Sequence, residues 1–328
     1  MIFDKKMAML YILDILKEYS DENHPLTQKD IIDKLHNIRM IDIERKTIAS
    51  TIELLTKYGY DVISVPKKGY YLYSRDFDET EIKYLVDAIY SSKTIPGVVA
   101  KKLSKKLYSS LSKYAQKDYA YLYKSTEINR AQNNDVFLNI ELINEAIKQK
   151  KKITFQYLIY DEKGKLTKRW DGYKYKVSPY FLINNFNKYY LLCNVNTHPN
   201  HANYRIEYMT NIEVLDEEIT PYKDIESMGE KFDISKYIND HIYMFGGELI
   251  NAKIEILNKN AITYVIDWFG ENARVYNEDG KIFATIKSND DAFFYWALQY
   301  QDHIKVLSPE KIVNRIVSSL EENIKKYK

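Results

Sequence analysis

The sequence has 328 residues, which is too many for one compact core and fits two or three domains. A hydrophobic fraction of 45% and a charged fraction of 29% exclude a disordered chain, and the net charge of +2 favours neither an acidic nor a basic partner. Because we find no secretory signal at the N-terminus and no apolar run of roughly 20 residues, we expect a cytoplasmic protein that does not span a membrane.

Two amphipathic helices are predicted near the N-terminus. Residues 7–19 repeat apolar side chains at helical spacing. Thr27 and Asp30 have the Thr-x-x-Asp spacing of a capping box, which predicts the start of a second helix. The side chains expected on the buried faces of these two helices are Met9, Ile12, Leu13, Leu16, Ile31, Ile32 and Leu35.

A third helix and a β-hairpin follow. The helix is predicted over residues 43–57, with Asp42 as its N-cap and Gly59 just beyond its end. Residues 61–74 contain two short β-rich runs joined by the segment 66–69, so we expect a hairpin with a basic tip. The third helix should bury Ile48, Ile52 and Leu55. Three short helices followed by a hairpin predict a winged helix-turn-helix.

The winged helix-turn-helix predicts contacts with double-stranded DNA. The second helix of this motif, here 43–57, enters the major groove with its N-terminal residues over the base edges. Lys and Arg read guanine edges, whereas Ser and Thr more often contact phosphates. Residues 1–74 hold eleven basic and eleven acidic residues, so binding depends on local placement, and each lysine has the alternative of only solvating a helix face. The candidate DNA-contacting residues are Thr27, Gln28, Lys29, Arg45, Lys46, Thr47, Ser50, Lys57, Lys67 and Lys68.

The middle of the chain changes from helix to strand. Helical patterns run over residues 78–117 and 138–150, with a polar hinge expected at 133–135. The first of these helices should bury Ile82, Leu85, Val86 and Ile89. Beyond Lys152, four runs are predicted as strands: ITFQY, YKVSPYFLI, KYYLLCNV and NYRIEYM. Short strands separated by polar turns are typical of a small β-barrel.

Residues 251–328 predict strand, helix, strand, strand, helix, strand and helix. A turn at 277–280 joins the middle strands, and residues 308–310 start the last helix. The first six elements have the βαββαβ order of a ferredoxin-like sandwich. The whole pattern predicts a multidomain α+β protein with a winged helix-turn-helix at 1–75, a helical linker at 76–136, a barrel domain at 137–220 and a C-terminal domain at 221–328.

Three of the strand segments resemble the WYL domain, an SH3-like or Sm-like barrel of bacterial regulators. Residues 189–191 (YYL) stand where the family has Trp-Tyr-Leu, and residues 177–180 (VSPY) match the strand with its near-fixed proline. Residues 204–209 (YRIEYM) match a Phe-Arg-Leu-Asp-Arg-Ile run, in which Arg205 is kept and Tyr208 replaces the second arginine. The N-terminal unit is similar to the winged units of these regulators, and the last segment looks like their C-terminal extension (WCX) domain.

The resemblance implies that the barrel senses a nucleotide-like or nucleic-acid ligand and relays its occupancy to the DNA-binding unit. Arg205 offers a planar donor fork for phosphate, and tyrosines stack on bases. Because adjacent strand residues face opposite ways, at least one of Tyr189 and Tyr190 should be core packing. The candidate ligand-binding residues are Ser178, Tyr180, Tyr189, Tyr190, Asn194, Arg205 and Tyr208.

An enzyme is not expected from this sequence. It contains no glycine loop that would cradle a phosphate and no nucleophile elbow. The single cysteine, Cys193, excludes an intrachain disulfide and lies in an apolar strand, where we expect a structural role. His198 and His201 have no carboxylate or thiol nearby in the sequence, so we expect exposed loop residues and neither a metal nor a cofactor.

Two functions remain open. We expect a transcription regulator that binds a two-fold DNA site as a homodimer. The alternative is a WYL-containing nucleic-acid-binding accessory protein, for example of a phage-defence system, that does not act at promoters. The winged unit favours duplex DNA, whereas equal or tighter binding of single-stranded RNA would favour the alternative.

Overall fold

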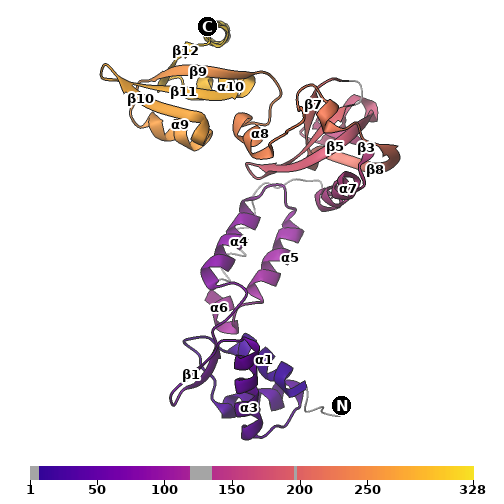
Figure 1. Ribbon diagram of the computed structural model, residues 1–328, viewed down its shortest axis with the longest axis vertical. Helices are drawn as coiled ribbons and strands as arrows, with labels where there is room; N and C mark the ends of the chain where they lie inside the picture. The colour runs from indigo at the N-terminus through magenta and orange to yellow at the C-terminus, as the bar shows by residue number, and fades with distance from the viewer. Residues whose placement is uncertain (1–6, 119–134, 196–197) are drawn as a thin grey trace. The chain divides into compact units, whose positions relative to one another are not determined.

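The computed structural model describes residues 7–118, 135–195 and 198–328 (Figure 1). The fold is a mixed α+β arrangement whose sheets are antiparallel. The chain divides into two compact units, residues 1–132 and 133–328, and each is described by itself. Of the hinge expected at 133–135, residues 133 and 134 lie outside the described residues. Among the described helices, none is long and apolar enough to cross a membrane.

The N-terminal unit begins with three helices: α1 (Ala8–Tyr19), α2 (Gln28–Arg39) and α3 (Arg45–Tyr58). The capping box of α2 is confirmed, because the backbone N–H of Asp30 donates to Thr27 Oγ1 at 3.2 Å and the N–H of Thr27 donates to Asp30 Oδ2 at 2.8 Å. The three helices share one apolar core, as their spacing predicts. Its most buried members are Ile12, Leu16, Ile31, Leu35, Ile48 and Leu55.

The start of α3 differs from the prediction. Glu44, not Asp42, is the N-cap of α3, and no side chain caps this end. The carboxylate of Asp42 lies 2.7 Å from His36 Nδ1, so it pairs with the end of α2 instead. The end of α3 is as predicted: Gly59 has a left-handed backbone (φ 116°), and its N–H donates to Leu55 O.

The predicted hairpin consists of β1 (Val62–Val65) and β2 (Gly69–Leu72), which pair antiparallel. It is joined to the helices by Leu26 and Tyr70, whose backbone N–H groups donate to each other's carbonyl oxygen at 2.8 Å. Gly69 sits against this bridge with φ 115°, and a Cβ atom there would lie 2.1 Å from Leu26 O. Only glycine fits that approach, so Gly69 fixes the hairpin against the helical core.

Three further helices follow in the described part of the N-terminal unit: α4 (Glu79–Ser91), α5 (Gly97–Tyr108) and α6 (Lys113–Asp118). Ile82 and Val86 of α4 are fully buried, whereas Leu85 is 39% exposed and does not belong to the buried face as expected. Arg75 ties these helices to α1, because its guanidinium donates to the carbonyl oxygens of Ser110, Lys17 and Ser20 at 2.8 to 2.9 Å.

The C-terminal unit opens with α7 (Val136–Gln149) and a six-stranded sheet. The strands are β3 (Lys151–Tyr160), β4 (Leu166–Lys168), β5 (Lys174–Asn185), β6 (Lys188–Val195), β7 (His201–Arg205) and β8 (Met209–Glu218). They pair in the order β4-β3-β5-β6-β7, and β8 pairs with β3. The core beneath α7 contains Ile143, Ile153, Phe155, Val177, Leu191 and Cys193.

One expectation for this sheet is wrong, and the expected small barrel is not confirmed. The run NYRIEYM is not one strand, because a short 3-10 turn (Ile206–Tyr208) separates β7 from β8. The barrel is not closed in the described residues: β7 pairs with β6 and β8 pairs with β3, and the two do not pair with each other. The turn after Arg205 redirects the chain from one edge of the sheet to β3.

The remaining elements have the order predicted from the sequence. After α8 (Ile234–Asp240) come β9 (Leu249–Ile256), α9 (Ala261–Phe269), β10 (Ala273–Glu278), β11 (Lys281–Asn289), α10 (Asp290–Gln299), β12 (Ile304–Ser308) and α11 (Glu310–Lys326). The four strands pair antiparallel in the order β10-β11-β9-β12. Phe293 and Trp296 of α10 are fully buried at the centre of this core.

Candidate functional site

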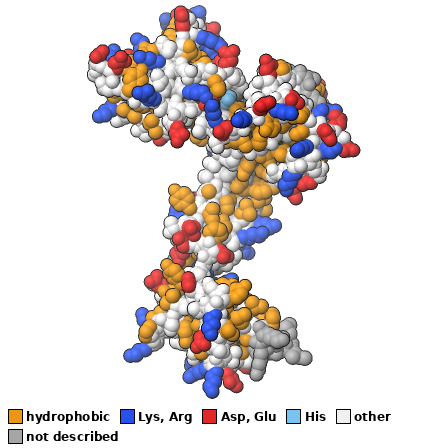
Figure 2. All heavy atoms as spheres, in the orientation of Figure 1, with side chains coloured by type: hydrophobic (Ala, Val, Ile, Leu, Met, Phe, Trp, Pro, Cys, Tyr) orange, Lys and Arg blue, Asp and Glu red, His pale blue; other side chains and the backbone are white. Residues whose placement is uncertain are grey.

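The first candidate surface is the outer face of α3. Arg45 and Lys46 at its first turn are exposed, as are Ser50 and Lys57, while Thr47 is half-buried. The Ser50 hydroxyl donates to Thr47 O at 3.1 Å and has its lone pairs left for another donor. The start of the helix therefore presents two cations beside a hydroxyl. Figure 2 shows Lys and Arg side chains at the surface of the N-terminal unit, mixed with acidic ones.

The neighbouring segments add further polar groups to that unit's surface. Lys67 and Lys68 at the hairpin turn are exposed, and so is Lys29 on α2, whereas Gln28 is half-buried. Thr27 is exposed, but its hydroxyl already serves the capping box, in which it also donates to Asp30 Oδ2 at 2.6 Å. Thr27 therefore helps to hold α2 in place and has little left to offer a partner.

Sequence reasoning missed two exposed apolar residues on α3. Leu54 is 54% exposed and Tyr58 is 80% exposed. They lie four residues apart, so both project from one face of the helix, next to the charged residues of its second half. A helical wheel of residues 43–57, extended by one residue, places both outside the predicted buried face, and this is the signal in the sequence for their exposure.

The second candidate site is a cavity of about 470 Å³ in the C-terminal unit. It brings together Tyr190 of β6 and Arg205 of β7, two residues that the family resemblance nominated. Its walls come from β3, β6, β7, the turn after β5, the segment before β9, and α9. The lining residues are Tyr157, Asn185, Phe186, Lys188, Tyr190, Asn203, Arg205, Ile242, Tyr243, Met244, Phe245 and Trp268.

Arg205 is the charged centre of this cavity, and two neighbours hold it. Its Nε donates to Glu207 Oε1 at 2.8 Å and its Nη2 donates to the same oxygen. Its guanidinium carbon lies 4.6 Å from the centre of the Tyr208 ring. Burial works against the charge of Arg205, but the hydrogen bond and the charge of Glu207, together with the nearby Tyr208 and Tyr190, outweigh burial and raise the pKa of Arg205. The guanidinium is thus charged, oriented and 30% exposed.

The tyrosines around Arg205 remain protonated near neutral pH. Burial raises the pKa of Tyr157 to about 12, and it also raises the pKa of Tyr190 and of Tyr208. The hydroxyl of Tyr157 accepts a hydrogen bond from the backbone N–H of Arg205 at 3.3 Å. Tyr208 replaces the family's second arginine, so it gives a ring beneath the Arg205 guanidinium in place of a second charge.

Tyr189 and Tyr190 face opposite sides of β6. Tyr189 packs against the core beneath α7, and Tyr190 lines the cavity. This is the alternation expected of a strand, and it leaves Tyr190 as the residue that a ligand can reach.

Ser178, Tyr180 and Asn194 do not line the Arg205 cavity, and all three are buried. Ser178 Oγ accepts from the N–H of Thr220 at 3.0 Å, and Tyr180 Oη donates to Thr220 O at 2.8 Å. Asn194 Nδ2 donates to the carbonyl oxygens of His198 and Asn200 at 2.7 and 3.0 Å. Their polar groups hold neighbouring loops, so we correct their assignment as ligand contacts.

Several cavity residues escaped the sequence reasoning. Lys188 adds a second basic side chain, and its position one residue before the Tyr-Tyr pair is a signal that was overlooked. Trp268 comes from α9, about 60 positions after Arg205 in the sequence. Its ring lies 5.1 Å from both Phe186 and Tyr243. Only the tertiary fold reveals this aromatic rim.

His201 is not the exposed loop residue that we expected. It begins β7, where its Nδ1 lies 2.7 Å from Ser227 Oγ and its Nε2 lies 2.9 Å from Tyr237 Oη. Burial, together with the nearby His241, lowers its pKa to about 4. His198 is exposed, and within the described residues no group of three or more His, Cys, Asp or Glu is placed to hold a metal ion. Cys193 is fully buried, which raises the pKa of its thiol.

Comparison with known families identifies two parts of the chain. Residues 139–214 match the WYL domain and residues 248–322 match the WCX domain, so the chain contains both. Arg205 and Tyr190 lie within the WYL match, and Trp268 lies within the WCX match. Neither match includes residues of the N-terminal unit.

Two solved structures are similar to the chain. One is proteasome accessory factor B/C (PafBC) of Arthrobacter aurescens, with 12% identity and a TM-score of 0.29 over 99% of this chain and 49% of that one. The chain thus spans about half the length of that protein. The other is described as a CRISPR Cas-related protein, with 16% identity and a TM-score of 0.39 over 97% and 85% of the two chains. No curated protein matches the sequence.

Proposed function

We propose that this protein is a DNA-binding transcription regulator whose WYL domain senses a nucleotide-like or single-stranded nucleic-acid ligand. The observation that carries the proposal is the placement of α3. Its apolar side packs into a three-helix core, while Arg45, Lys46 and Ser50 are exposed at its first turns. An exposed, rigidly held helix start of this composition suits the major groove of duplex DNA.

In this proposal the N-terminal unit is a winged helix-turn-helix. The helices α2 and α3 are the motif, and the β1–β2 hairpin is the wing, whose Lys67 and Lys68 contact an adjacent phosphate backbone. Arg45 and Lys46 contact base edges or phosphates at the groove. A homodimer presents two copies of α3 to a two-fold site.

The ligand binds at the Arg205 cavity in the WYL domain. The guanidinium of Arg205, oriented by Glu207, receives a phosphate oxygen, and Lys188 adds a second positive charge. The rings of Tyr190 and Trp268 in the lining offer faces on which a base can stack. We interpret the sheet around this cavity as an open SH3-like sheet. We interpret the WCX part as a ferredoxin-like domain, and its strand order β10-β11-β9-β12 supports this second interpretation.

Ligand and DNA affinities are coupled in this proposal. The ligand changes the equilibrium of the regulator between states with different affinities for the operator, so DNA must change the ligand affinity by the same factor. Arg205→Ala should abolish the effect of the ligand and leave ligand-free DNA binding intact. If the ligand changed DNA binding by this variant as it does in the wild type, Arg205 would not be part of the ligand site.

The test of the function is a selection of bound sequences from random duplex DNA, with single-stranded RNA as a competitor. We expect enrichment of a two-fold symmetric duplex that a roughly equal concentration of RNA does not displace. The proposal of a transcription regulator would be overturned if no duplex were enriched, or if the RNA bound equally or more tightly. Either result would support an accessory protein that acts away from promoters.

A further inference from the structure

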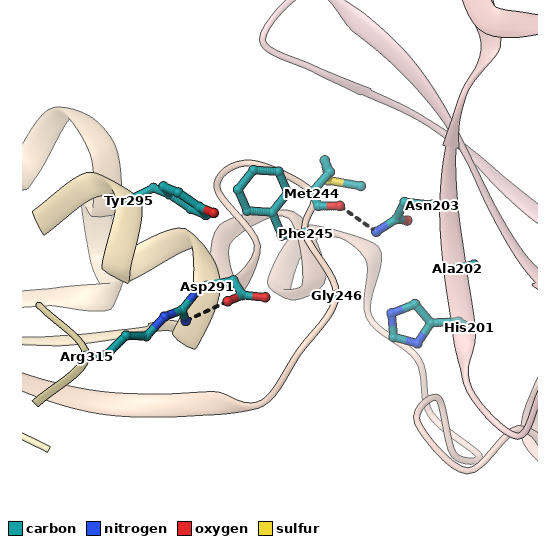
Figure 3. Close-up of a pocket in the computed structure, with 9 residues that line it drawn as sticks. All are labelled: His201, Ala202, Asn203, Met244, Phe245, Gly246, Asp291, Tyr295 and Arg315. Carbon is teal, nitrogen blue, oxygen red and sulfur yellow. Dashed lines mark hydrogen bonds and ion pairs between the residues drawn. The ribbon is translucent and has the colours of Figure 1, made fainter. Parts of the chain in front are cut away.

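A further cavity of the C-terminal unit, of about 730 Å³, adjoins the Arg205 cavity. The two share Asn203, Met244 and Phe245 in their linings, but Arg205 lines only the smaller one. Figure 3 shows Asp291, Tyr295 and Arg315 on one side, from α10 and α11, with the segment Met244–Gly246 between them and β7. The opposite wall is His201, Ala202 and Asn203 of β7. A cavity of this size accommodates a small organic ligand.

One wall holds an oppositely charged pair in a fixed geometry. Arg315 Nη1 donates to Asp291 Oδ1 at 2.7 Å. The guanidinium carbon of Arg315 lies 3.9 Å from the centre of the Phe294 ring, which fixes its plane. The side chains are 36% and 42% exposed, so both remain accessible. They present a charged acceptor beside a fork of donors.

The same side of the cavity offers aromatic surface. Phe245 and Tyr295 are 41% and 52% exposed, and their ring centres lie 5.8 Å apart at an angle of 69°. Gly246, next to Phe245, has open space where a side chain would lie. A flat ligand can therefore lie against a ring while its edge reaches the Asp291–Arg315 pair.

The opposite wall is polar but uncharged near neutral pH. The low pKa of His201 keeps its imidazole neutral, and its two nitrogens already face Ser227 and Tyr237. Asn203 Nδ2 donates to Tyr237 Oη at 2.7 Å and to Met244 O at 3.0 Å. This wall therefore supplies no charge that would attract a free anion or cation.

We infer that this cavity is a second ligand site, which takes a guanine-type base. Asp291 and Arg315 carry no net charge together, so the pair does not favour a bare phosphate or a simple amine. It complements a neutral edge that has donors beside an acceptor. Guanine has such an edge: N1–H and the N2 amino group donate to the carboxylate of Asp291, and O6 accepts from Arg315. The purine rings lie against Phe245 or Tyr295.

The test is calorimetric titration of the full-length chain with guanosine, inosine and adenosine, which share the ribose. Guanosine should bind most tightly. Inosine lacks the N2 amino group and should bind about tenfold more weakly, because it loses a hydrogen bond to a charged acceptor. Adenosine should bind more weakly still, because it lacks the N1–H donor and the O6 acceptor.

Asp291→Asn should reduce the affinity for guanosine about tenfold or more, whereas the matched variant Asp302→Asn, at an exposed position, should not change it. Arg205→Ala should leave guanosine binding unchanged, which separates this site from the proposed sensor cavity. The inference is overturned if guanosine does not bind at roughly 1 mM, if adenosine binds as tightly, or if Arg205→Ala abolishes binding. Near-UV circular dichroism of Asp291→Asn establishes that the variant is folded.

Discussion

Lowering the pH from about 7.5 to about 5.0 is expected to destabilise the unit formed by residues 133–328 through His201. The imidazole lies between Ser227 and Tyr237, and a neutral ring satisfies both contacts, with one nitrogen donating and the other accepting. Burial, with a smaller contribution from His241, lowers the pKa of His201 to about 4. Protonation therefore costs more in the folded unit than in the unfolded chain.

The direction and size of this pH effect on stability follow from the linkage between proton binding and folding. An unfolded histidine has a pKa of about 6.5, so below that value the unfolded chain binds a proton that folded His201 does not. The contribution of His201 is complete above about pH 6.5 and is lost as the pH falls towards 4. At about pH 5.0 the loss amounts to roughly 2 kcal/mol of the free energy of unfolding. His241, whose pKa is also lowered by burial, changes stability in the same direction.

The assay is urea unfolding followed by tryptophan emission. All three tryptophans, Trp170, Trp268 and Trp296, belong to the C-terminal unit, so the signal reports on that unit alone. We compare the wild type with His201→Gln at both pH values, since glutamine keeps a donor and an acceptor but does not titrate. The wild type should lose roughly 2 kcal/mol more than the variant on acidification. Equal losses of stability in the two proteins would refute the conclusion that His201 is neutral in the folded unit.

Two further perturbations test the packing of each unit. Gly69→Ala should lower the free energy of unfolding of the N-terminal unit by about 2 kcal/mol or more, measured by the far-UV circular dichroism of urea unfolding, because its Cβ would meet Leu26 O. Gly59→Ala is the matched control, with nearly the same φ but open space around it, and an equal loss there would remove the clash as the cause. Glu207→Gln should destabilise the C-terminal unit by about 1 to 2 kcal/mol at neutral pH, because Arg205 exchanges a carboxylate partner for a neutral amide. An unchanged midpoint in the tryptophan assay would show that Glu207 does not hold Arg205.

Local signals in the sequence predicted most of the elements. The capping box at Thr27, the left-handed end at Gly59 and the β1–β2 hairpin each depend on residues close together in the chain. The prediction of Asp42 as an N-cap was wrong because its carboxylate contacts His36 on the preceding helix. Local capping rules do not include such a contact. The expected small barrel is not closed in the described residues, because β7 and β8 do not pair with each other, a long-range feature that strand patterns do not show.

The candidate site was only partly predictable. The resemblance to the WYL domain nominated Tyr190 and Arg205, and strand alternation separated Tyr190 from Tyr189. Ser178 and Asn194 carry the same polar groups as ligand contacts, and only the fold shows that their bonds are made to nearby backbone. Trp268 joins the cavity from another domain, so no short-range pattern could place it there.

The measurement that tests the central claim most directly is the affinity of α3 variants for the selected duplex and for a random duplex of equal length. Lys46→Ala combined with Ser50→Ala should weaken binding of the selected duplex by about tenfold or more, and binding of the random duplex much less. A matched double variant, Lys281→Ala with Ser318→Ala, changes an exposed lysine and serine of the C-terminal unit and should bind like the wild type. An unchanged affinity and footprint for the α3 variant would contradict the account of this protein as a helix-turn-helix regulator.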